Sequence, residues 1–176
     1  MKLSGRHVVF CALATLTTSA VLNAQGGKPS PPAKAQVDLK GKQITVDYSR
    51  PKMRGRKIMG GLVPYGEVWR TGANDATSLK TAVDLDIGGA KVPAGSYTLY
   101  SLPSQNSWKL IINKQTGQWG TEYDPAQDLA RVDLVNSALP SPLEDFTIEF
   151  EKTATDSTTL VLKWETTKLS VPVRAR

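Results

Sequence analysis

The amino-acid sequence predicts an all-β protein, an antiparallel β-sandwich of roughly eight to ten strands with one long irregular loop rich in arginine and glycine. Two observations lead to this prediction. Apolar residues recur at every second position in several short runs, which is the period of a strand with one buried face. Glycine and proline separate these runs, as tight turns between antiparallel strands require. A β-barrel is the alternative, because short half-buried strands build both architectures.

The predicted strands follow one another along most of the chain. Their inward-facing residues are Ile44, Val46 and Tyr48; Val83, Leu85 and Ile87; Trp108, Leu110 and Ile112; Phe146, Ile148 and Phe150; Leu160, Leu162 and Trp164; and Leu169, Val171 and Val173. This alternation places Trp108 and Trp164 in the core. Gly88 and Gly89 predict a tight hairpin with positive φ angles, and residues 93–95 precede a strand over residues 96–102. Residues 122–129 are expected to contain one helical turn.

The N-terminus has the charged, apolar and small-residue order of a secretory signal peptide. Lys2 and Arg6 precede the uncharged apolar residues 8–16, and small and polar residues follow to Ala24. The apolar part is much shorter than the roughly 20 residues that span a bilayer as a helix. We therefore expect residues 1–24 to be removed, and the mature protein to be periplasmic or secreted without a membrane span.

The remaining chain is expected to form one domain over residues 33–174, after a flexible linker at residues 25–32 that is rich in Gly, Pro and Ser. Removing Lys2 and Arg6 lowers the count of Lys and Arg from 22 to 20 against 16 acids, so the mature net charge is +4. Nucleic-acid-binding surfaces usually gather a larger positive field, so nucleic acid is not an expected partner.

The only cysteine and the only histidine, Cys11 and His7, both lie in the predicted signal peptide. The mature chain therefore cannot use Ser-His-Asp or Cys-His nucleophilic catalysis, nor build the usual zinc, haem or copper sites. We assign no catalytic residue, no metal ligand and no cofactor, and we do not expect an enzyme.

One segment, residues 47–77, has no sustained period of either kind and holds five glycines and two prolines. Between Arg50 and Arg70 there are six basic residues and one acid, Glu67, so this part carries a charge of +5. Apolar residues such as Ile58 and Val63 are interleaved, which predicts that the segment packs. A long loop of this kind within a domain is usually functional or disordered.

Three motifs in this order resemble the bacterial family of domain of unknown function 2911 (DUF2911). They are YSRPKMRGRKIMGGLVPYGEVWRTGANDAT, GGAKVPAGSYTLYSLP and WKLIINKQTGQWG, and the similarity spans roughly residues 31–173. The residues that match the recurring pattern include Arg50, Pro51, Gly55, Arg56, Gly60, Pro64, Trp69, Arg70, Thr71, Gly72, Asn74, Trp119 and Gly120. The resemblance implies an exported bacterial protein and transfers no activity and no catalytic residue.

The candidate ligand-binding residues are Arg50, Arg56, Trp69, Arg70, Asn74 and Trp119. Guanidinium groups bind carboxylate or phosphate through paired hydrogen bonds, and an indole face stacks on a sugar or a cation. Together these residues would suit an anionic small molecule or a component of the cell envelope. A purely structural role is the competing interpretation, because arginines can satisfy the many backbone carbonyls of an irregular loop.

Two further functions remain open at this stage. The domain could be a structural or accessory module that contacts a protein partner in the envelope. It could also be a glycoside hydrolase that works with two carboxylates, for which Asp47, Asp75, Glu122, Asp124 and Asp145 are candidates by residue type alone. A concave cavity would favour ligand binding, a flat patch a protein partner, and two facing acids a hydrolase.

Overall fold

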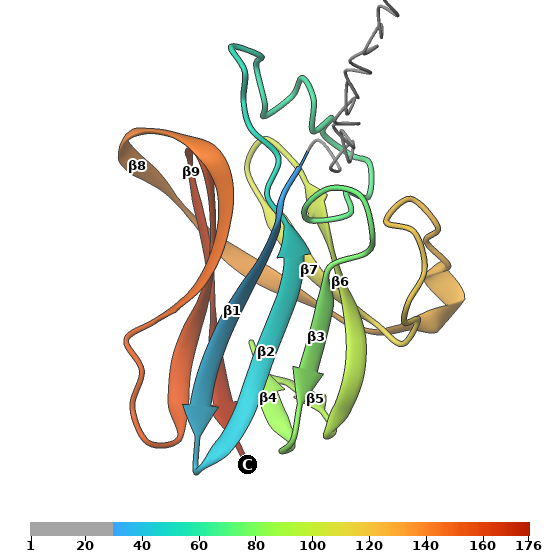
Figure 1. Ribbon diagram of the computed structural model, residues 1–176, viewed down its shortest axis with the longest axis vertical. Helices are drawn as coiled ribbons and strands as arrows, with labels where there is room; N and C mark the ends of the chain where they lie inside the picture. Colours follow the sequence, from blue (N-terminus) through green and yellow to red (C-terminus); the bar gives the residue numbers. More distant parts are fainter. Residues whose placement is uncertain (1–29) are drawn as a thin grey trace, which may run out of the picture.

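The computed structural model describes residues 30–176, which form nine β-strands and one short 3-10 turn. The strands are β1 (Pro32–Leu39), β2 (Lys42–Ser49), β3 (Ser78–Thr81), β4 (Leu85–Ile87), β5 (Ala90–Val92), β6 (Gly95–Pro103), β7 (Trp108–Asn113), β8 (Asp128–Glu151) and β9 (Ser157–Ala175), and the turn is η1 (Pro125–Gln127) (Figure 1). The turn falls within the segment where the sequence predicts one.

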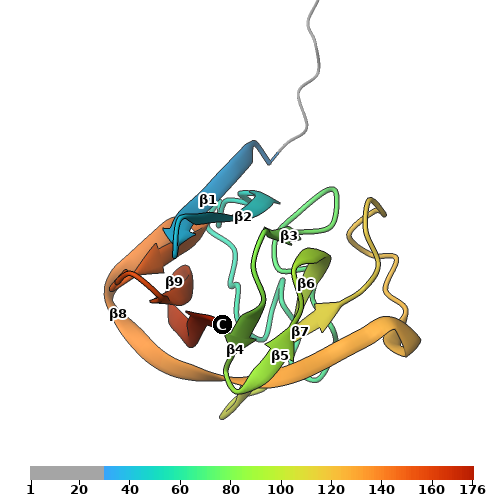
Figure 2. The same ribbon diagram turned by 90° about the horizontal axis from the view of Figure 1, so that it is seen from below.

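All strand pairs are antiparallel, and the strands form one sheet in the order β1-β2-β3-β6-β7-β8-β9-β4-β5. The all-β antiparallel prediction is confirmed, with nine strands inside the predicted range. The sheet does not close, so the barrel alternative is not realised. Its strands curve around a shared interior, which is consistent with a sandwich-like packing (Figure 2).

Strand β8 is the element that connects the two parts of this sheet. It is 24 residues long, pairs with β7 as far as Leu134 and pairs with β9 from Val135 onward. Its pairing with β9 shifts register on both sides of Leu143, next to Pro140 and Pro142. Prolines and irregular pairing bend a strand, and β8 is visibly curved along its length (Figure 1).

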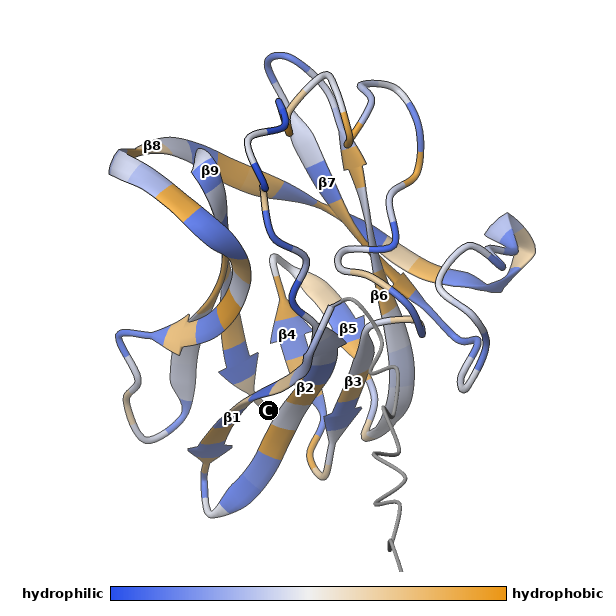
Figure 3. Cartoon of the chain, turned by 45° about the horizontal axis from the view of Figure 1, so that its top comes forward, coloured by the Kyte–Doolittle hydropathy of each residue, from blue (hydrophilic) through white to orange (hydrophobic). Residues whose placement is uncertain are grey.

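The core follows the predicted alternation of apolar residues. Of the predicted inward-facing side chains, all are buried except Val83 and Phe150, which are half-buried against the same core. Alternating hydrophobic and hydrophilic bands along the strands show this pattern (Figure 3). Gly88 and Gly89 have φ angles of 57° and 89° and join β4 to β5, so the predicted tight hairpin is confirmed.

Strands β6 and β7 depart from simple alternation because both of their faces are covered. Residues 110–113 of β7 are all buried. On the second face, the connection from β7 to β8 folds back over the strands: Thr98 donates to the carbonyl of Gln115, and Tyr100 donates to the carbonyl of Glu122. This covering segment, residues 114–127, forms one side of the site described below.

The fold begins before the predicted domain start at residue 33. Ser30 is buried, the carbonyl of Pro31 accepts from the backbone N–H of Arg50, and β1 begins at Pro32. A proline lacks the N–H donor but keeps its carbonyl acceptor, which is how this edge joins the fold. Residues 30–32 of the predicted linker therefore belong to the domain, and β9 continues one residue past the predicted end, to Ala175.

The predicted signal peptide, residues 1–24, lies outside the described residues, as do Cys11, His7 and residues 25–29 of the predicted linker. In residues 30–176, no helix has the length and apolar character needed to cross a membrane.

Candidate functional site

The basic loop, residues 50–77, joins β2 to β3 and is packed against the sheet. Ile58 and Val63 are fully buried, as the sequence predicts for its interleaved apolar residues. Single bridges pair Lys52 with Asp145 of β8 and Trp69 with Ser101 of β6. The loop is thereby tied to two distant strands, which fixes the side chains that it carries.

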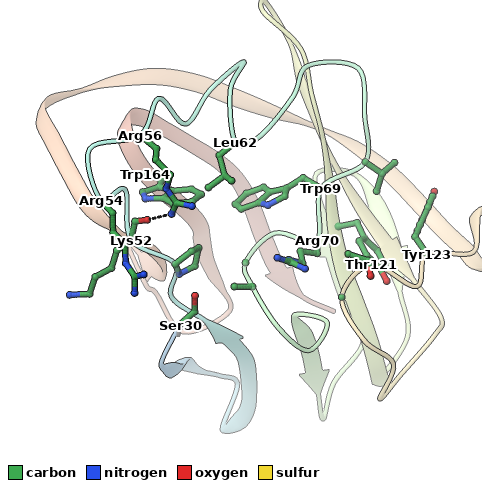
Figure 4. Close-up of a pocket in the computed structure, with 16 residues that line it drawn as sticks. Ser30, Lys52, Arg54, Arg56, Leu62, Trp69, Arg70, Thr121, Tyr123 and Trp164 are labelled. Carbon is green, nitrogen blue, oxygen red and sulfur yellow. Dashed lines mark hydrogen bonds between the residues drawn. The ribbon is translucent and has the colours of Figure 1, made fainter. Parts of the chain in front are cut away.

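A cavity of about 510 Å³ lies between the basic loop and the sheet (Figure 4). Its lining comes from five separate parts of the chain: the start of the fold, the basic loop, β6, the connection from β7 to β8, and β9. The lining residues are Ser30, Pro51, Lys52, Arg54, Arg56, Leu62, Val68, Trp69, Arg70, Gly72, Ala73, Tyr100, Gly120, Thr121, Tyr123 and Trp164.

Four of the lining side chains are cationic, and within the described part of the chain no Asp or Glu lines the cavity. Aromatic rings and small residues make up much of the remaining wall. A concave, positively charged space with apolar walls concentrates electric field and attracts anions.

Arg70 is the cationic residue with the most available hydrogen-bonding capacity. It is half-buried, and its guanidinium group has no hydrogen bond or ion pair with any residue that the structure describes. Its stem lies against Gly120: a Cβ at that position would come within 2.7 Å of Arg70 Cδ. Only glycine at position 120 leaves room for the stem, so the backbone there helps to place the guanidinium in the cavity.

The residues beside Arg70 are fixed to β6. Trp69 N donates to Ser101 O at 2.8 Å and Ser101 N donates to Trp69 O at 2.9 Å. Thr71 Oγ1 donates to Ser101 Oγ at 3.0 Å. Arg70 is therefore presented from a rigid segment, which lowers the entropy lost when it binds a ligand.

Two tryptophans form what we call the aromatic wall of the cavity. Trp69 and Trp164 stack with ring centroids 5.8 Å apart and an angle of 19° between planes, and Trp69 also meets the ring of Phe146 edge-on at 5.0 Å. Trp164 Nε1 donates to Glu144 O at 3.1 Å. Trp164 is almost fully buried, so the half-buried Trp69, held in place by its neighbours, presents the accessible aromatic surface of this wall to a sugar, an aromatic ring or an apolar chain.

The other three cationic residues, Lys52, Arg54 and Arg56, are exposed at the opening, and we call them the rim cations. Arg56 is oriented by its own loop, with Nε donating to Met53 O at 2.9 Å and Nη2 to Lys52 O at 2.6 Å. Lys52 Nζ lies 3.7 Å from Asp145 Oδ1. Arg54 donates its backbone N–H to Glu144 Oε1 at 2.9 Å.

The structure brings Arg56, Trp69 and Arg70 of the predicted site together at the cavity, and it places Arg50, Asn74 and Trp119 outside the lining. Arg50 donates from Nε to Phe146 O at 3.2 Å and from Nη2 to Thr147 Oγ1 at 3.0 Å, so it braces β8. These contacts fit the structural role that the sequence left open for the loop arginines.

Asn74 and Trp119 make their contacts outside the cavity lining. The buried side-chain amide of Asn74 donates to Ser30 O at 2.9 Å and to Ser49 Oγ at 3.2 Å. The backbone of Asn74 has a φ of 60°. Trp119 is 43% exposed and forms a backbone bridge with Asp75. Both residues hold the loop and the connection from β7 to β8 against each other.

Several lining residues were not identified from the sequence. Trp164 is 1% exposed, as expected of a core residue, yet it also lines the cavity. Tyr100 and Tyr123 meet edge-on at 4.9 Å. Nothing in the local pattern around these residues signals a site, because each is brought there by the way distant segments pack.

The two tyrosine hydroxyls of the cavity are already hydrogen-bonded. Tyr123 donates to Asp128 Oδ2 at 2.7 Å and accepts from Arg131 Nη2 at 2.8 Å. Burial, reinforced by the Asp128 carboxylate, raises the pKa of Tyr123 to about 12. Burial also raises the pKa of Tyr100. Both phenols therefore stay neutral at physiological pH and add no negative charge to the cavity.

Glycoside hydrolysis and metal binding each require particular side chains close together. A glycosidase needs two facing carboxyl groups, and the described lining has none. Residues 30–176 also contain no cluster of three or more His, Cys, Asp or Glu side chains that could hold a metal ion.

A comparison with family models identifies the chain. The model described as "Protein of unknown function (DUF2911)" matches residues 30–173 of the 176-residue chain, so the protein belongs to this family. Among the curated proteins and the solved structures, no match was found.

Proposed function

We propose that this member of the DUF2911 family binds a small anionic ligand, free or as part of a cell-envelope component, in the cavity beneath the basic loop. The observation that carries this proposal is the lining itself: four cationic side chains face one cavity that no described carboxylate enters. Like charges gathered around one cavity repel one another, so an anion that enters relieves this repulsion.

Arg70 is the anchor of the proposed site. A guanidinium presents its N–H donors in a planar fork that matches a carboxylate or a phosphate. The Arg70 guanidinium donates to no residue that the structure describes, so its donors are available to a ligand. Its partial burial strengthens each hydrogen bond that it makes to that ligand. The aromatic wall then supports binding of the uncharged part of the ligand.

The shape of the site supports a small ligand over a flat contact with a protein partner. The cavity volume of about 510 Å³ lies within the range of roughly 300–1,000 Å³ typical of small-molecule sites. The proposal is for binding, because the lining offers no carboxylate base and the chain from Gln25 onward has no histidine or cysteine.

The test is the melting temperature of the purified protein against phosphates, carboxylates and acidic sugars, for the wild type, Arg70→Met and Arg70→Lys. A ligand at about 100 times its dissociation constant should stabilise the fold by roughly 2.7 kcal/mol, a shift of about 5–10 °C for this size of domain. Arg70→Met should abolish the shift. Arg70→Lys should restore only part of it, because it keeps the charge without the fork. A shift that is unchanged in Arg70→Met would refute the assignment.

The proposal includes export to the periplasm or the medium, supported by the charged, apolar and small-residue order of residues 1–24. Expression of the full chain in a bacterial host should yield a periplasmic or secreted protein whose first residue is Gln25. Mass spectrometry of the N-terminus and cell fractionation measure both properties. An intact N-terminus in the cytoplasm would contradict this part of the proposal.

A further inference from the structure

The cationic residues of the cavity fall into two groups (Figure 4). The rim cations lie together at one end of the cavity. Arg70 lies apart from them, toward Thr121, and Trp164, Leu62 and Trp69 follow one another along the wall from the rim cations to Arg70. The lining therefore presents two separate cationic groups to one cavity.

We propose that the cavity selects an elongated ligand with two anionic groups joined by a flat or apolar-faced ring. Arg70 binds one anionic group, the rim cations bind the other, and the ring lies on the aromatic wall. This inference rests on the proposed function and specifies the ligand class.

The two ends of the ligand are held in different ways. At the inner end, Arg70 is half-buried and gives directional, paired hydrogen bonds to a carboxylate or phosphate. At the rim, Arg56 already donates from Nε and Nη2 to backbone carbonyls, and Lys52 lies near Asp145. The rim therefore acts mainly through its summed charge, and its contribution should weaken as salt is added.

The aromatic wall sets the chemistry of the middle of the ligand. Trp164 is almost fully buried and stacks on Trp69, so the half-buried Trp69 presents the accessible aromatic surface and its neighbours fix its position. A flat ring covers such a surface with little loss of conformational freedom, whereas a charged or strongly hydrated linker would lose its water without a polar partner.

The experiment uses defined probes and the full-length mature protein. Phenyl phosphate carries one anionic group, and the para-bisphosphates of benzene and biphenyl carry two at different separations. Benzoate and the matching dicarboxylates form a second arm that distinguishes phosphate from carboxylate recognition. Affinity is measured by calorimetry and by tryptophan fluorescence, at low and at high salt.

We expect a bis-anion of one of the two lengths to bind at least about tenfold more tightly than the mono-anion, and to lose most of this advantage at high salt. The double variant Lys52→Gln/Arg54→Gln should also remove the advantage, because it weakens binding of the bis-anion much more than binding of the mono-anion. The control double variant, Lys91→Gln/Lys114→Gln, removes the same charge from residues that do not line the cavity and should keep the advantage.

Each result has a distinct meaning. If mono-anions bind through Arg70 and a second anionic group adds nothing, the two-ended ligand is refuted and the proposed function stands. An advantage that survives in the rim variant, or that falls equally in the control, also refutes the inference. If no probe binds the wild type, both proposals fail. Should the double variant melt early without ligand, Arg54→Gln alone replaces it, because this single change keeps the backbone donor to Glu144 and leaves Lys52 beside Asp145.

Discussion

Arg50 and Arg70 lie in the same basic loop, yet their guanidinium groups are used in opposite ways. Arg50 donates to Phe146 O and Thr147 Oγ1 on β8 and lies outside the cavity lining. Arg70 lies in the lining and has no hydrogen bond or ion pair within residues 30–176. The difference shows that the number of arginines in a loop says little about its capacity to bind anions. That capacity depends on the N–H donors that make no hydrogen bond within the fold.

The two sides of the basic loop also differ in how their polar side chains are used. Behind the cavity, the buried Asn74 side chain donates to Ser49 Oγ and to the carbonyl of Ser30, a residue that also lines the cavity. Inside the cavity, the Arg70 guanidinium makes no hydrogen bond to a residue that the structure describes. We therefore expect substitutions behind the cavity to lower stability, and substitutions inside it to lower affinity. Four predictions test this separation, beginning with the largest expected change in stability.

Asn74→Ala should be the most destabilising of these substitutions, by about 2–4 kcal/mol. It removes two buried hydrogen bonds, and it places at a φ of 60° a residue that tolerates the left-handed region less well than asparagine does. Denaturant unfolding measures the loss. Asn74→Gly removes the same hydrogen bonds without the backbone strain, so it should be less destabilising than alanine by about 1 kcal/mol. If both variants lost the same free energy of unfolding, backbone strain at position 74 would make no contribution.

Arg50→Met should lower the free energy of unfolding by about 1–2 kcal/mol, because the substitution keeps the stem and removes the donors to β8. Ligand affinity should stay close to wild type, since Arg50 does not line the cavity. Unfolding curves and calorimetric titration on one sample measure both quantities. If Arg50→Met kept full stability but lost ligand binding, Arg50 would belong to the binding site and would not be a structural brace.

Acid should weaken the β8–β9 pair through Glu151, a residue that does not line the cavity. Lys163 and Lys168 hydrogen-bond to Glu151 and hold its pKa at about 2, below its ordinary value of 4.5. A lowered folded pKa means that the ion pairs contribute stability above pH 4.5, and that this contribution is lost as pH falls toward 2. Glu151→Gln should show a shallower fall in melting temperature between pH 5 and pH 2.5 than the wild type. Parallel curves would show that Glu151 contributes nothing.

Arg70→Met should have the smallest effect on the free energy of unfolding, within about 0.5 kcal/mol, while ligand binding is lost. Methionine keeps an unbranched stem against Gly120, and no described hydrogen bond is removed. The same unfolding assay used for Arg50→Met gives a matched comparison. A loss above 1 kcal/mol without ligand would show that Arg70 is also a structural brace.

Much of the fold could be predicted from the sequence because its determinants are local. Alternation at Ile44, Val46 and Tyr48 correctly predicts three buried side chains, and the Gly88-Gly89 pair correctly predicts a hairpin. The extent of β8 could not be predicted in this way. Prolines and a break in alternation around residues 139–145 conceal that one strand runs through them.

The site was predictable only in part, because a cavity depends on which distant segments meet. The unusual charge of residues 50–70 directs attention to the loop, and Arg56, Trp69 and Arg70 line the cavity. Residue type alone cannot separate Arg70 from Arg50, since the distinction lies in contacts with β8. Tyr100 and Trp164 belong to ordinary strand patterns and reach the cavity through packing.

The origin of the cavity lining in five separate parts of the chain has a consequence for folding. Ser30 precedes the first strand, Trp164 lies in the last one, and both line the same space. Contacts between residues so distant in sequence close large loops and tend to be among the later ones to form. A truncated or half-folded chain would lack part of the lining, so a ligand of this cavity would bind and protect from proteolysis only molecules whose folding is complete.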